Sequence, residues 1–378
     1  GKWLKFWWLK PHAFGLGLAI AQQGFGSGRT AATAKMPVPR VMVVNPSGEE
    51  SLGVLDDALK EAGAAVEEFT TQEAVELLAP SPPSESVKVV PELPRSSAGH
   101  DCLVLLGSPL GVRTDTTEGS SGQTPAGLIE QMETLVRDFH AAEKPVLGIC
   151  LGAQVVARTF GGSVSKLPCD VEHTALPLPV QPAAGVEFGY HEQKFSEAAE
   201  ADPVLGPALQ AWRSAGGPGP ISVAPKFQQW HSDTFTMPQE AVPLSTRPTC
   251  PAQAFRLGRR TYAFQYHIEV GRELAEEWYE EYMDGSASHA TCGANAPLVG
   301  EAQQAAVRAH VSDAIAEGSC ARTEAFTRSV MLGLLAQAST MRQERSRRFA
   351  FTAAAVVAAA AVMVGVGVAL TARRRAKT

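Results

Sequence analysis

The sequence predicts an α/β fold with a mostly parallel sheet and flanking helices. Short apolar runs at 40–45, 102–106 and 146–149 have the length of buried strands, and the first two end in turns of glycine, serine and proline. Segments with apolar residues at helical spacing follow them. Unbroken apolar strands that alternate with helices are typical of a parallel sheet. Ligands bind at the carboxyl ends of such strands, where Gly107 and Cys150 lie.

The remaining elements can be assigned in chain order. After the first strand, a leucine stripe predicts a helix over 52–62, and five prolines with several serines predict an exposed loop over 79–100. After the second strand, apolar residues predict a helix over 128–139. Beyond 161–162 the segments become shorter and richer in proline, which predicts antiparallel additions. Three further helical stretches follow, at 273–283, 301–316 and 322–341.

The regions outside this central part have a different character. Residues 1–35 form a basic and aromatic N-terminal extension, with no acidic residue before Glu49. Two interpretations stay open: a targeting or interfacial segment, or upstream sequence that is not translated, with Met36 as the start. We expect the α/β domain to cover 36–283. Residues 284–348 are predicted to be a linker and a helical stalk, and whether these helices instead cap the domain stays open.

The C-terminal region predicts a membrane anchor. No residue from 349 to 372 is charged, and basic residues flank this run on both sides, including a basic tail at 373–378. At about 1.5 Å per residue the run would span roughly 36 Å, enough for a hydrocarbon core of about 30 Å. We therefore expect a transmembrane helix over 349–372 that serves as a single-pass tail anchor, with the α/β domain in the cytosol. An alanine-rich soluble helix is the alternative, and the organelle stays open.

Composition excludes several classes of function. The net charge of −6 over 378 residues leaves no electrostatic footprint for nucleic acid. The six cysteines form no closely spaced pair and indicate reduced thiols. The histidines lack metal-ligand spacing, and the chain has no glycine-rich phosphate loop. We therefore expect no metal and no cofactor.

One cysteine stands in a setting that suggests catalysis. Cys150 lies between an apolar strand and a helical pattern, with Gly148 and Gly152 on either side, which is the layout of a nucleophile elbow. The glycines let the backbone turn sharply and pack closely. The oriented amides at the start of a helix stabilise a thiolate. Attack on a carbonyl needs donors for the oxyanion, and the backbone amides of Leu151 and of the turn at Ser108 are the candidates.

A histidine and a carboxylate that could serve this thiol follow further along the chain. His267 and Glu269 are two residues apart, and alternate side chains of an extended strand share a face. They can therefore act as a base and as the acid that orients it. Together with Cys150 they predict a cysteine-dependent acyl-transfer enzyme.

Simpler interpretations exist for each of these residues. Cys150 could be an inert core thiol, although burial explains neither the elbow nor its glycines. His267 and Glu269 could form a surface ion pair. His231 and Asp233 could line the site, or they could form a hydrogen-bonded turn with a purely structural role.

Several segments together resemble a known family. They match the class I (triad) glutamine amidotransferases, in particular the group similar to the glutaminase domain of GMP synthase, and they occur in family order across roughly 40–283. The matching segments are Gly148-Ile149-Cys150-Leu151-Gly152-Ala153-Gln154, Glu187-Phe188-Gly189-Tyr190, Gln229-Trp230-His231-Ser232-Asp233, Gln253-Ala254-Phe255-Arg256 and Gln265-Tyr266-His267-Ile268-Glu269.

The resemblance implies a fold, a reaction and residue roles. The fold would be a flavodoxin-like sheet, and the reaction would hydrolyse the γ-amide of glutamine through a γ-glutamyl thioester and release ammonia. Cys150 would be the nucleophile, His267 the base and then the acid, and Glu269 the orienting group. Gln154 matches a position that helps to bind the amino acid end of the substrate.

Two positions depart from the family pattern. Ser108 stands where a glycine usually completes the oxyanion hole, and positive φ there would cost about 1–3 kcal/mol in strain. Ile268 stands where proline usually separates the histidine from the glutamate, which keeps the spacing. Neither departure removes a reacting group.

Three functions remain open on the sequence alone. The first is a membrane-tethered glutaminase that passes ammonia to a partner protein, because the chain has no adenylating or phosphate-binding motif of its own. The second is a γ-glutamyl peptidase that acts on glutathione-like small molecules. The third is a catalytically inactive scaffold anchored to a membrane.

Overall fold

The computed structural model describes residues 38–48, 50–78, 83–115, 124–167, 187–215, 224–248, 250–284 and 301–375. The chain divides into two units, 1–37 and 38–378, and all described residues lie in the second. The predicted N-terminal extension over 1–35 lies outside the described residues. All elements below belong to the second unit.

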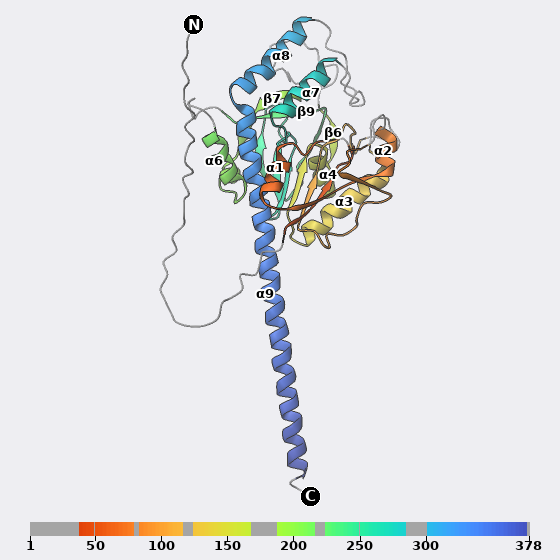
Figure 1. Cartoon of the computed structure of the whole chain (residues 1–378), viewed down its shortest axis with the longest axis vertical. Coiled ribbons are helices and arrows are strands. Elements are labelled where there is room, and N and C mark those ends of the chain that lie inside the picture. The colour runs from red at the N-terminus through yellow and green to blue at the C-terminus, as the bar shows by residue number, and fades with distance from the viewer. Residues whose placement is uncertain are drawn as a thin grey trace, which may run out of the picture. The chain divides into compact units, whose positions relative to one another are not determined.

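A single large sheet forms the centre of this unit (Figure 1). Within the described residues it has nine strands, in the order β3-β2-β1-β4-β5-β13-β12-β11-β8. The first six are parallel and the last three are antiparallel additions, which confirms the mostly parallel α/β sheet. In chain order the strands are β1 (Arg40–Val44), β2 (Ala65–Thr71), β3 (Val87–Val90), β4 (Cys102–Leu105), β5 (Val146–Ile149), β8 (Lys194–Phe195), β11 (Val242–Thr246), β12 (Ala254–Leu257) and β13 (Thr261–Phe264).

Helices cover both faces of the sheet. The helices α3 (Ala126–Ala141) and α4 (Leu151–Thr159) pack on one face, and α1 (Val54–Glu61), α6 (Leu205–Ala215) and α9 (Ser319–Arg375) pack on the other. Alternate strand residues serve the two faces: Val41 and Val43 join the core beside α9, whereas Met42 and Val44 join the core beside α3. Because both faces are buried, the central strands β4 and β5 are buried along their whole length and carry no polar side chain other than a thiol.

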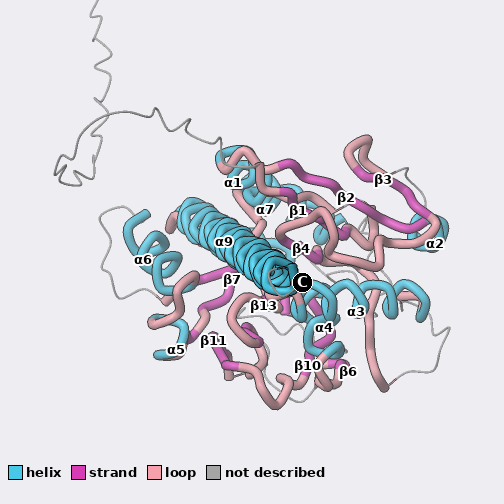
Figure 2. The backbone as a smooth tube through the Cα atoms, turned by 90° about the horizontal axis from the view of Figure 1, so that it is seen from below, coloured by secondary structure: helices cyan, strands magenta, loops and turns pink. Residues whose placement is uncertain are grey.

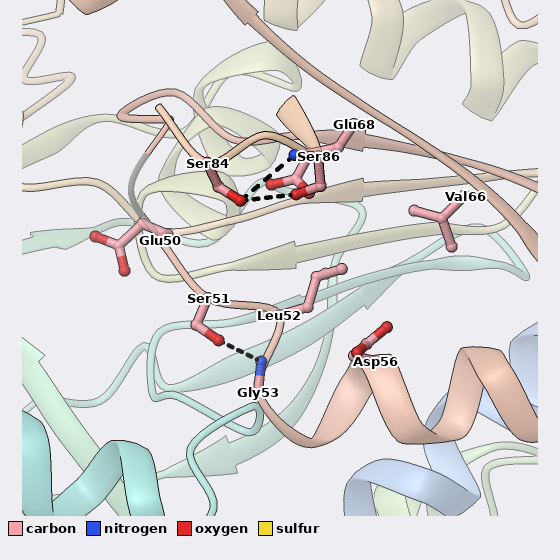
Figure 3. A pocket seen from close by; sticks show the side chains of 9 residues that line it. All are labelled: Glu50, Ser51, Leu52, Gly53, Asp56, Val66, Glu68, Ser84 and Ser86. Atoms are coloured by element: carbon pink, nitrogen blue, oxygen red, sulfur yellow. Dashed lines mark hydrogen bonds between the residues drawn. The ribbon is translucent and has the colours of Figure 1, made fainter. Parts of the chain in front are cut away.

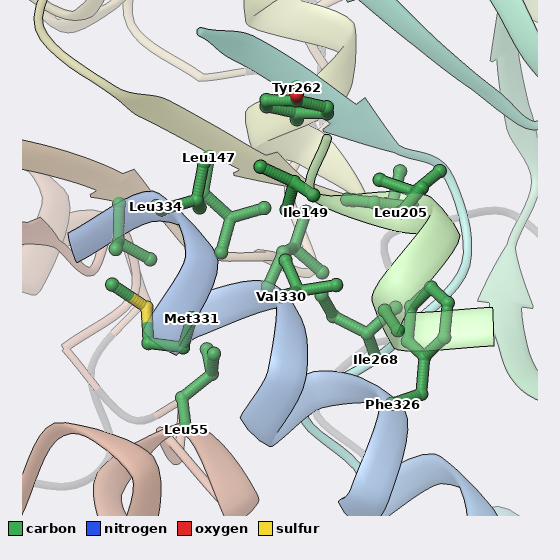
Figure 4. Close-up of a cluster of buried hydrophobic side chains, with 14 of the residues drawn as sticks. Leu55, Leu147, Ile149, Leu205, Tyr262, Ile268, Phe326, Val330, Met331 and Leu334 are labelled. Carbon is green, nitrogen blue, oxygen red and sulfur yellow. The ribbon is translucent and has the colours of Figure 1, made fainter. Parts of the chain in front are cut away.

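The first part of α9 belongs to the core of the domain. Phe326, Val330, Met331 and Leu334 are fully buried in one cluster with strand residues (Figure 4). They recur at the spacing of one helical face. Figure 2 shows α9 running between α1 and α6. The sequence leaves open whether the helices before residue 349 form a stalk or a cap. In the structure, the first part of α9 packs on the sheet.

The predicted membrane anchor is wrong. No helix in the described part of the chain has both the length and the apolar character that crossing a membrane requires. The predictions of a transmembrane helix over 349–372, of a tail anchor and of a membrane location are therefore wrong. The prediction rests on the absence of charge in a run whose commonest residue is alanine, which carries little apolar surface. In the structure this run continues α9 without a break.

Smaller elements complete the unit. Two antiparallel pairs, β6 (Val164–Lys166) with β10 (Asp233–Phe235) and β7 (Glu187–Glu192) with β9 (Lys226–His231), confirm the additions expected beyond 161–162. Strand β3 lies inside the segment 79–100, for which the sequence predicts a loop. The other helices are α2 (Gln72–Leu78), α5 (Glu197–Glu200), α7 (Arg272–Asp284) and α8 (Glu301–Ala316).

Candidate active site

The segments that follow β4, β5 and β13 meet at one edge of the sheet. They bring Gly107, Cys150 and His267 together: a Cβ atom added to Gly107 would lie 3.3 Å from Cε1 of His267 and 3.6 Å from Cβ of Cys150. The thiol and the imidazole therefore both border a position that carries no side chain. The prediction that Gly107 and Cys150 stand at the carboxyl ends of strands is confirmed.

The backbone at Cys150 has the geometry of a nucleophile elbow. Cys150 has φ 52° and ψ −110°, and it caps the start of α4. A non-glycine residue in such a conformation stores strain of about 1–3 kcal/mol, which the surroundings must sustain. A Cβ atom on Gly148 would lie 2.6 Å from the carbonyl oxygen of Gly152, and one on Gly152 would lie 2.3 Å from that of Leu105. The flanking glycines are therefore required by close backbone packing.

His267 and Glu269 are joined by a short hydrogen bond. Nδ1 of His267 lies 2.6 Å from Oε1 of Glu269, and both residues are 3% exposed, which excludes the surface ion pair. They lie beyond β13, which ends at Phe264, so a regular strand does not align them as predicted. The backbone amide of His267 instead donates to the carbonyl of Gln228 on β9, at 2.9 Å. The amide of Val54, at the start of α1, donates to the carbonyl of Glu269, also at 2.9 Å.

The surroundings of His267 favour its protonated form. Burial lowers the pKa of His267, but the charges of Glu269 and Cys150, together with side-chain hydrogen bonding to Cys150 and Glu269, raise it well above its usual value. The Nε2 atom of His267 is buried, and no group within the described residues meets the distance and angle of a full hydrogen bond to it. This atom is therefore free to exchange a proton with the thiol or with a substrate.

Two glutamine side chains connect the thiol to the protein interior. Nε2 of Gln265 donates to Sγ of Cys150 at 3.8 Å, and Oε1 of Gln265 accepts from Nε2 of Gln154 at 3.2 Å. Gln154 also donates to the backbone carbonyl of Asp233, at 3.4 Å. The role of Gln154 in substrate binding stays a prediction, since its amide nitrogen contacts protein groups. Sequence reasoning does not assign a role to Gln265, although it lies two residues before His267.

The two candidate oxyanion donors lie at the same edge of the sheet. Leu151 is the first residue of α4, where backbone amides have no partner inside the helix. Among the described non-glycine residues, only Glu143 and Cys150 have φ in the left-handed region. Ser108 therefore does not adopt the positive φ that would strain it. Its hydroxyl oxygen accepts a hydrogen bond from the amide of Leu110 at 3.2 Å.

His231 belongs to a buried polar network beside the site. Its Nε2 lies 3.1 Å from Oε2 of Glu187, and its Nδ1 lies 2.9 Å from the carbonyl of Asp233. The other carboxylate oxygen of Glu187 pairs with Arg247 at 3.0 Å. These contacts favour the structural interpretation of His231. Sequence reasoning misses Arg247, because nothing in its local pattern points to a partner so far along the chain.

Asp233 keeps a partly polar environment at the start of β10. Burial raises the pKa of its carboxyl, and the nearby charges of Lys166 and Arg113 oppose this. Nζ of Lys166 lies 3.6 Å from Oδ1 of Asp233. Asp233 thus contacts Lys166 through its carboxylate, and it contacts Gln154 and His231 through its backbone carbonyl.

A pocket of about 440 Å³ lies beside the start of α1 (Figure 3). It is bordered by the loop at 50–53, the side chains of Val66 and Glu68 on β2, and Asp56 on α1. None of the predicted site residues lines it. In the described part of the chain, no group of three or more histidine, cysteine or acidic residues is arranged to hold a metal ion.

Comparisons with known proteins show the family of the chain. The family model of class I glutamine amidotransferases matches residues 85–280. The chain is 26% identical over 184 residues to the glutamine amidotransferase-like protein YfeJ of Salmonella typhimurium, covering 49% of this chain and 63% of that protein. It is 30% identical over 145 residues to a glutamine-hydrolysing GMP synthase component of Natronomonas pharaonis, covering 37% and 61%. The matched segments thus span less than two thirds of these relatives.

Solved structures show the shared fold. A glutamine amidotransferase of Thermotoga maritima aligns with a TM-score of 0.50 at 20% identity, covering 79% of this chain and 98% of that protein. One of Methylobacillus flagellatus aligns with a TM-score of 0.52 at 19% identity, covering 79% and 94%. The flavodoxin-like sheet implied by the resemblance is therefore confirmed. The family model matches more than half of this chain, and the chain therefore belongs to the class I glutamine amidotransferase family.

Proposed function

We propose that this protein hydrolyses the γ-amide of glutamine through a covalent thioester on Cys150. One observation carries the proposal: Cys150, whose backbone is strained at the start of α4, lies beside the buried imidazole of His267. Nδ1 of this imidazole lies 2.6 Å from Oε1 of Glu269. His267 acts as base and acid, and Glu269 orients it. Strain at the elbow supports this assignment, because such strain persists where function requires it.

The first half of the reaction forms the thioester. Nε2 of His267 takes the proton of the Cys150 thiol, and the thiolate attacks the γ-carbonyl carbon of glutamine. The negative charge that develops on the carbonyl oxygen is stabilised by the backbone amides of Leu151 and Ser108. The carbon–nitrogen bond then breaks as the imidazolium of His267 gives its proton to the leaving amine, and ammonia departs.

The second half returns the enzyme to its starting state. His267 removes a proton from a water molecule, and the resulting hydroxide attacks the thioester carbon. The carbon–sulfur bond breaks, glutamate leaves, and the sulfur regains a proton from His267. Because the pKa of His267 is raised well above its usual value, its imidazole readily takes up the proton that each half of the reaction requires it to carry.

We also propose that the ammonia passes to a partner protein. The support is that a similar relative is named as one component of a GMP synthase that hydrolyses glutamine.

The proposal is tested by the release of ammonia and glutamate from glutamine by the full chain. Cys150→Ala should lower the rate by about 10⁴-fold or more, since the loss of a nucleophile removes the covalent route. The matched control is Cys102→Ala: this thiol is fully buried in the core, and burial raises its pKa to about 12, so it is inert. The control should stay within a few-fold of the wild type.

Other outcomes would change the assignment. Equal rates in the wild type and in Cys150→Ala would exclude thiol catalysis. Faster release of glutamate from glutathione than from glutamine would favour the γ-glutamyl peptidase. No turnover of either compound by the folded wild type would favour an inactive scaffold.

A further inference from the structure

A tryptophan from outside the predicted site packs against its histidine. The ring of Trp278 on α7 lies 4.7 Å from the imidazole of His267, centroid to centroid, with the two planes at 90°. Trp278 is 8% exposed, so this contact is shielded from water. Perpendicular aromatic pairs at this distance attract each other beyond the effect of area burial.

The same tryptophan connects the histidine to the wall beside the thiol. Trp278 packs on Trp230 of β9, with centroids 5.4 Å apart and planes at 73°. The backbone carbonyl of Trp230 lies 3.9 Å from Sγ of Cys150. These two residues thus contact both of the groups that must exchange a proton: Trp278 contacts the imidazole with its ring, and Trp230 contacts the thiol with its backbone carbonyl.

The local sequence explains how Trp278 reaches this place. Helix α7 begins at Arg272, three residues after Glu269, so its first turns must lie beside the site. Ala275 and Trp278 are three residues apart on one helical face, and both are buried in a small cluster with Val270. The contact is therefore fixed by the short connection between Glu269 and the helix.

The imidazole depends on packing for its orientation. Its short side-chain hydrogen bond runs from Nδ1 to Glu269, at 2.6 Å, and that bond alone permits the ring to tilt about its axis. The titratable groups that face it are Glu269 from its own segment and Cys150 from the start of α4. The ring of Trp278 packs against the imidazole, and the position at Gly107, which carries no side chain, borders its Cε1 atom.

We propose that Trp278 is a positioning residue for the reaction: its ring holds the imidazole of His267 in line with the sulfur of Cys150 and stabilises the imidazolium. Tryptophan attracts a cation within about 6 Å of its ring more strongly than the other aromatic residues do. A tilted or neutral imidazole would neither maintain the thiolate nor deliver a proton to the leaving amine. The catalytic consequence of this inference rests on the proposed function, whereas the contact between the two rings does not.

The first test measures glutaminase activity of the full chain against pH. Trp278→Leu should lower kcat about tenfold with KM within about twofold, and the descending limb of kcat/KM should move to lower pH by about one unit. Trp278→Phe, which keeps an aromatic ring, should recover most of the activity and the wild-type pH profile. The matched control is Trp212→Leu on α6: Trp212 is buried and lies under Arg322, away from the histidine.

The second test measures alkylation of Cys150 by iodoacetamide and needs no substrate. Below pH 7 the rate in Trp278→Leu should fall about tenfold relative to the wild type, whereas Trp278→Phe and Trp212→Leu should match the wild type. If glutamine is not hydrolysed but alkylation behaves in this way, the proposed function fails and the inference stands.

Two results would overturn the inference. One is a folded Trp278→Leu protein with unchanged pH profile and unchanged alkylation. The other is an equal loss in Trp278→Phe and Trp278→Leu, which would mean that the residue serves packing alone. Should Trp278→Leu not fold, Trp278→Met is read by the same two criteria.

Discussion

The two faces of the sheet are built from different parts of the chain. One face is covered by α3 and α4, which directly precede and follow the strand that presents Cys150. The other face is covered by α1, α6 and α9, and α9 begins only at Ser319. The first face could be assembled from neighbouring segments of the sequence. The second requires a helix that returns to the sheet from the far end of the described chain.

The second face also contacts the segment of the candidate site. Phe326 of α9 packs on Phe227 at 4.8 Å and on Phe264 at 6.3 Å, centroid to centroid. The hydroxyl of Thr327 donates to the carbonyl of Ile268, the residue between His267 and Glu269. The side chains of Phe326 and Ile268 appear together in Figure 4. The helix that the sequence places outside the α/β domain thus supports the segment that carries His267 and Glu269.

The largest expected effect tests whether α9 is part of the core. Phe326→Ala should lower the free energy of unfolding by about 3–5 kcal/mol, because it leaves a cavity among fully buried aromatic rings. The matched control is Phe351→Ala, on the same helix but 78% exposed, which should change it by less than about 0.5 kcal/mol. Urea unfolding of the full chain measures both. Equal, small losses would mean that the packing of α9 on the sheet is not part of the folded state.

The other face offers a comparison between two glycines. Gly152→Ala should destabilise by about 3 kcal/mol or more, since its Cβ atom would lie 2.3 Å from the carbonyl oxygen of Leu105. Gly127→Ala, on α3, meets nothing within 4 Å and should stabilise by about 0.5–1 kcal/mol. Urea midpoints that do not separate these two variants would contradict the close packing of the elbow.

What could be predicted from the sequence follows the same division. The elbow at Cys150 and the pair His267 and Glu269 are contiguous motifs, so their residue types reveal them. The contacts of Gln265 with Gln154, and of Phe326 with the sheet, join positions far apart in the sequence. Hydrophobic periodicity predicts that a helix has a buried face, but it does not say which distant surface that face covers.

The predictions for the short strand β3 and for the membrane anchor fail for local reasons. A strand of only four residues is too short to show a strand pattern, and the prolines and serines around Val87–Val90 favour a loop. The run after residue 349 lacks charge, but its apolar character, and not its charge alone, decides membrane insertion.

The pH dependence of stability tests the electrostatics of the site. The folded protein keeps the proton of His267 above about pH 6.5, where the unfolded chain has released it. The stabilisation from this proton is therefore complete below about pH 6.5 and is lost as the pH rises through the folded pKa, with a slope of up to about 1.4 kcal/mol per pH unit. The difference in unfolding free energy between the wild type and His267→Gln should shrink with rising pH.

A histidine on the first face provides the opposite sign. Burial lowers the pKa of His140 on α3, so its native environment should be penalised as the pH falls below about 6.5. His140→Gln should therefore gain stability relative to the wild type on acidification. The same slope in both variants would contradict the assignment of charge to His267.

The smallest expected effect concerns Ser108. Because its backbone is outside the left-handed region, a glycine there relieves no strain. Ser108→Gly should change kcat for glutamine hydrolysis by less than about threefold, since the donor is the backbone amide and only the hydrogen bond between the serine hydroxyl and the amide of Leu110 is lost. A gain of tenfold or more would indicate that serine does impair the oxyanion site.

The thioester itself provides the most direct test of the account. The full chain is mixed with glutamine, quenched in acid during turnover, digested and examined by mass spectrometry. The account predicts one γ-glutamyl group on the peptide that contains Cys150, and none in the Cys150→Ala protein. Ammonia release without this adduct, or with the adduct on another cysteine such as Cys102, would contradict it.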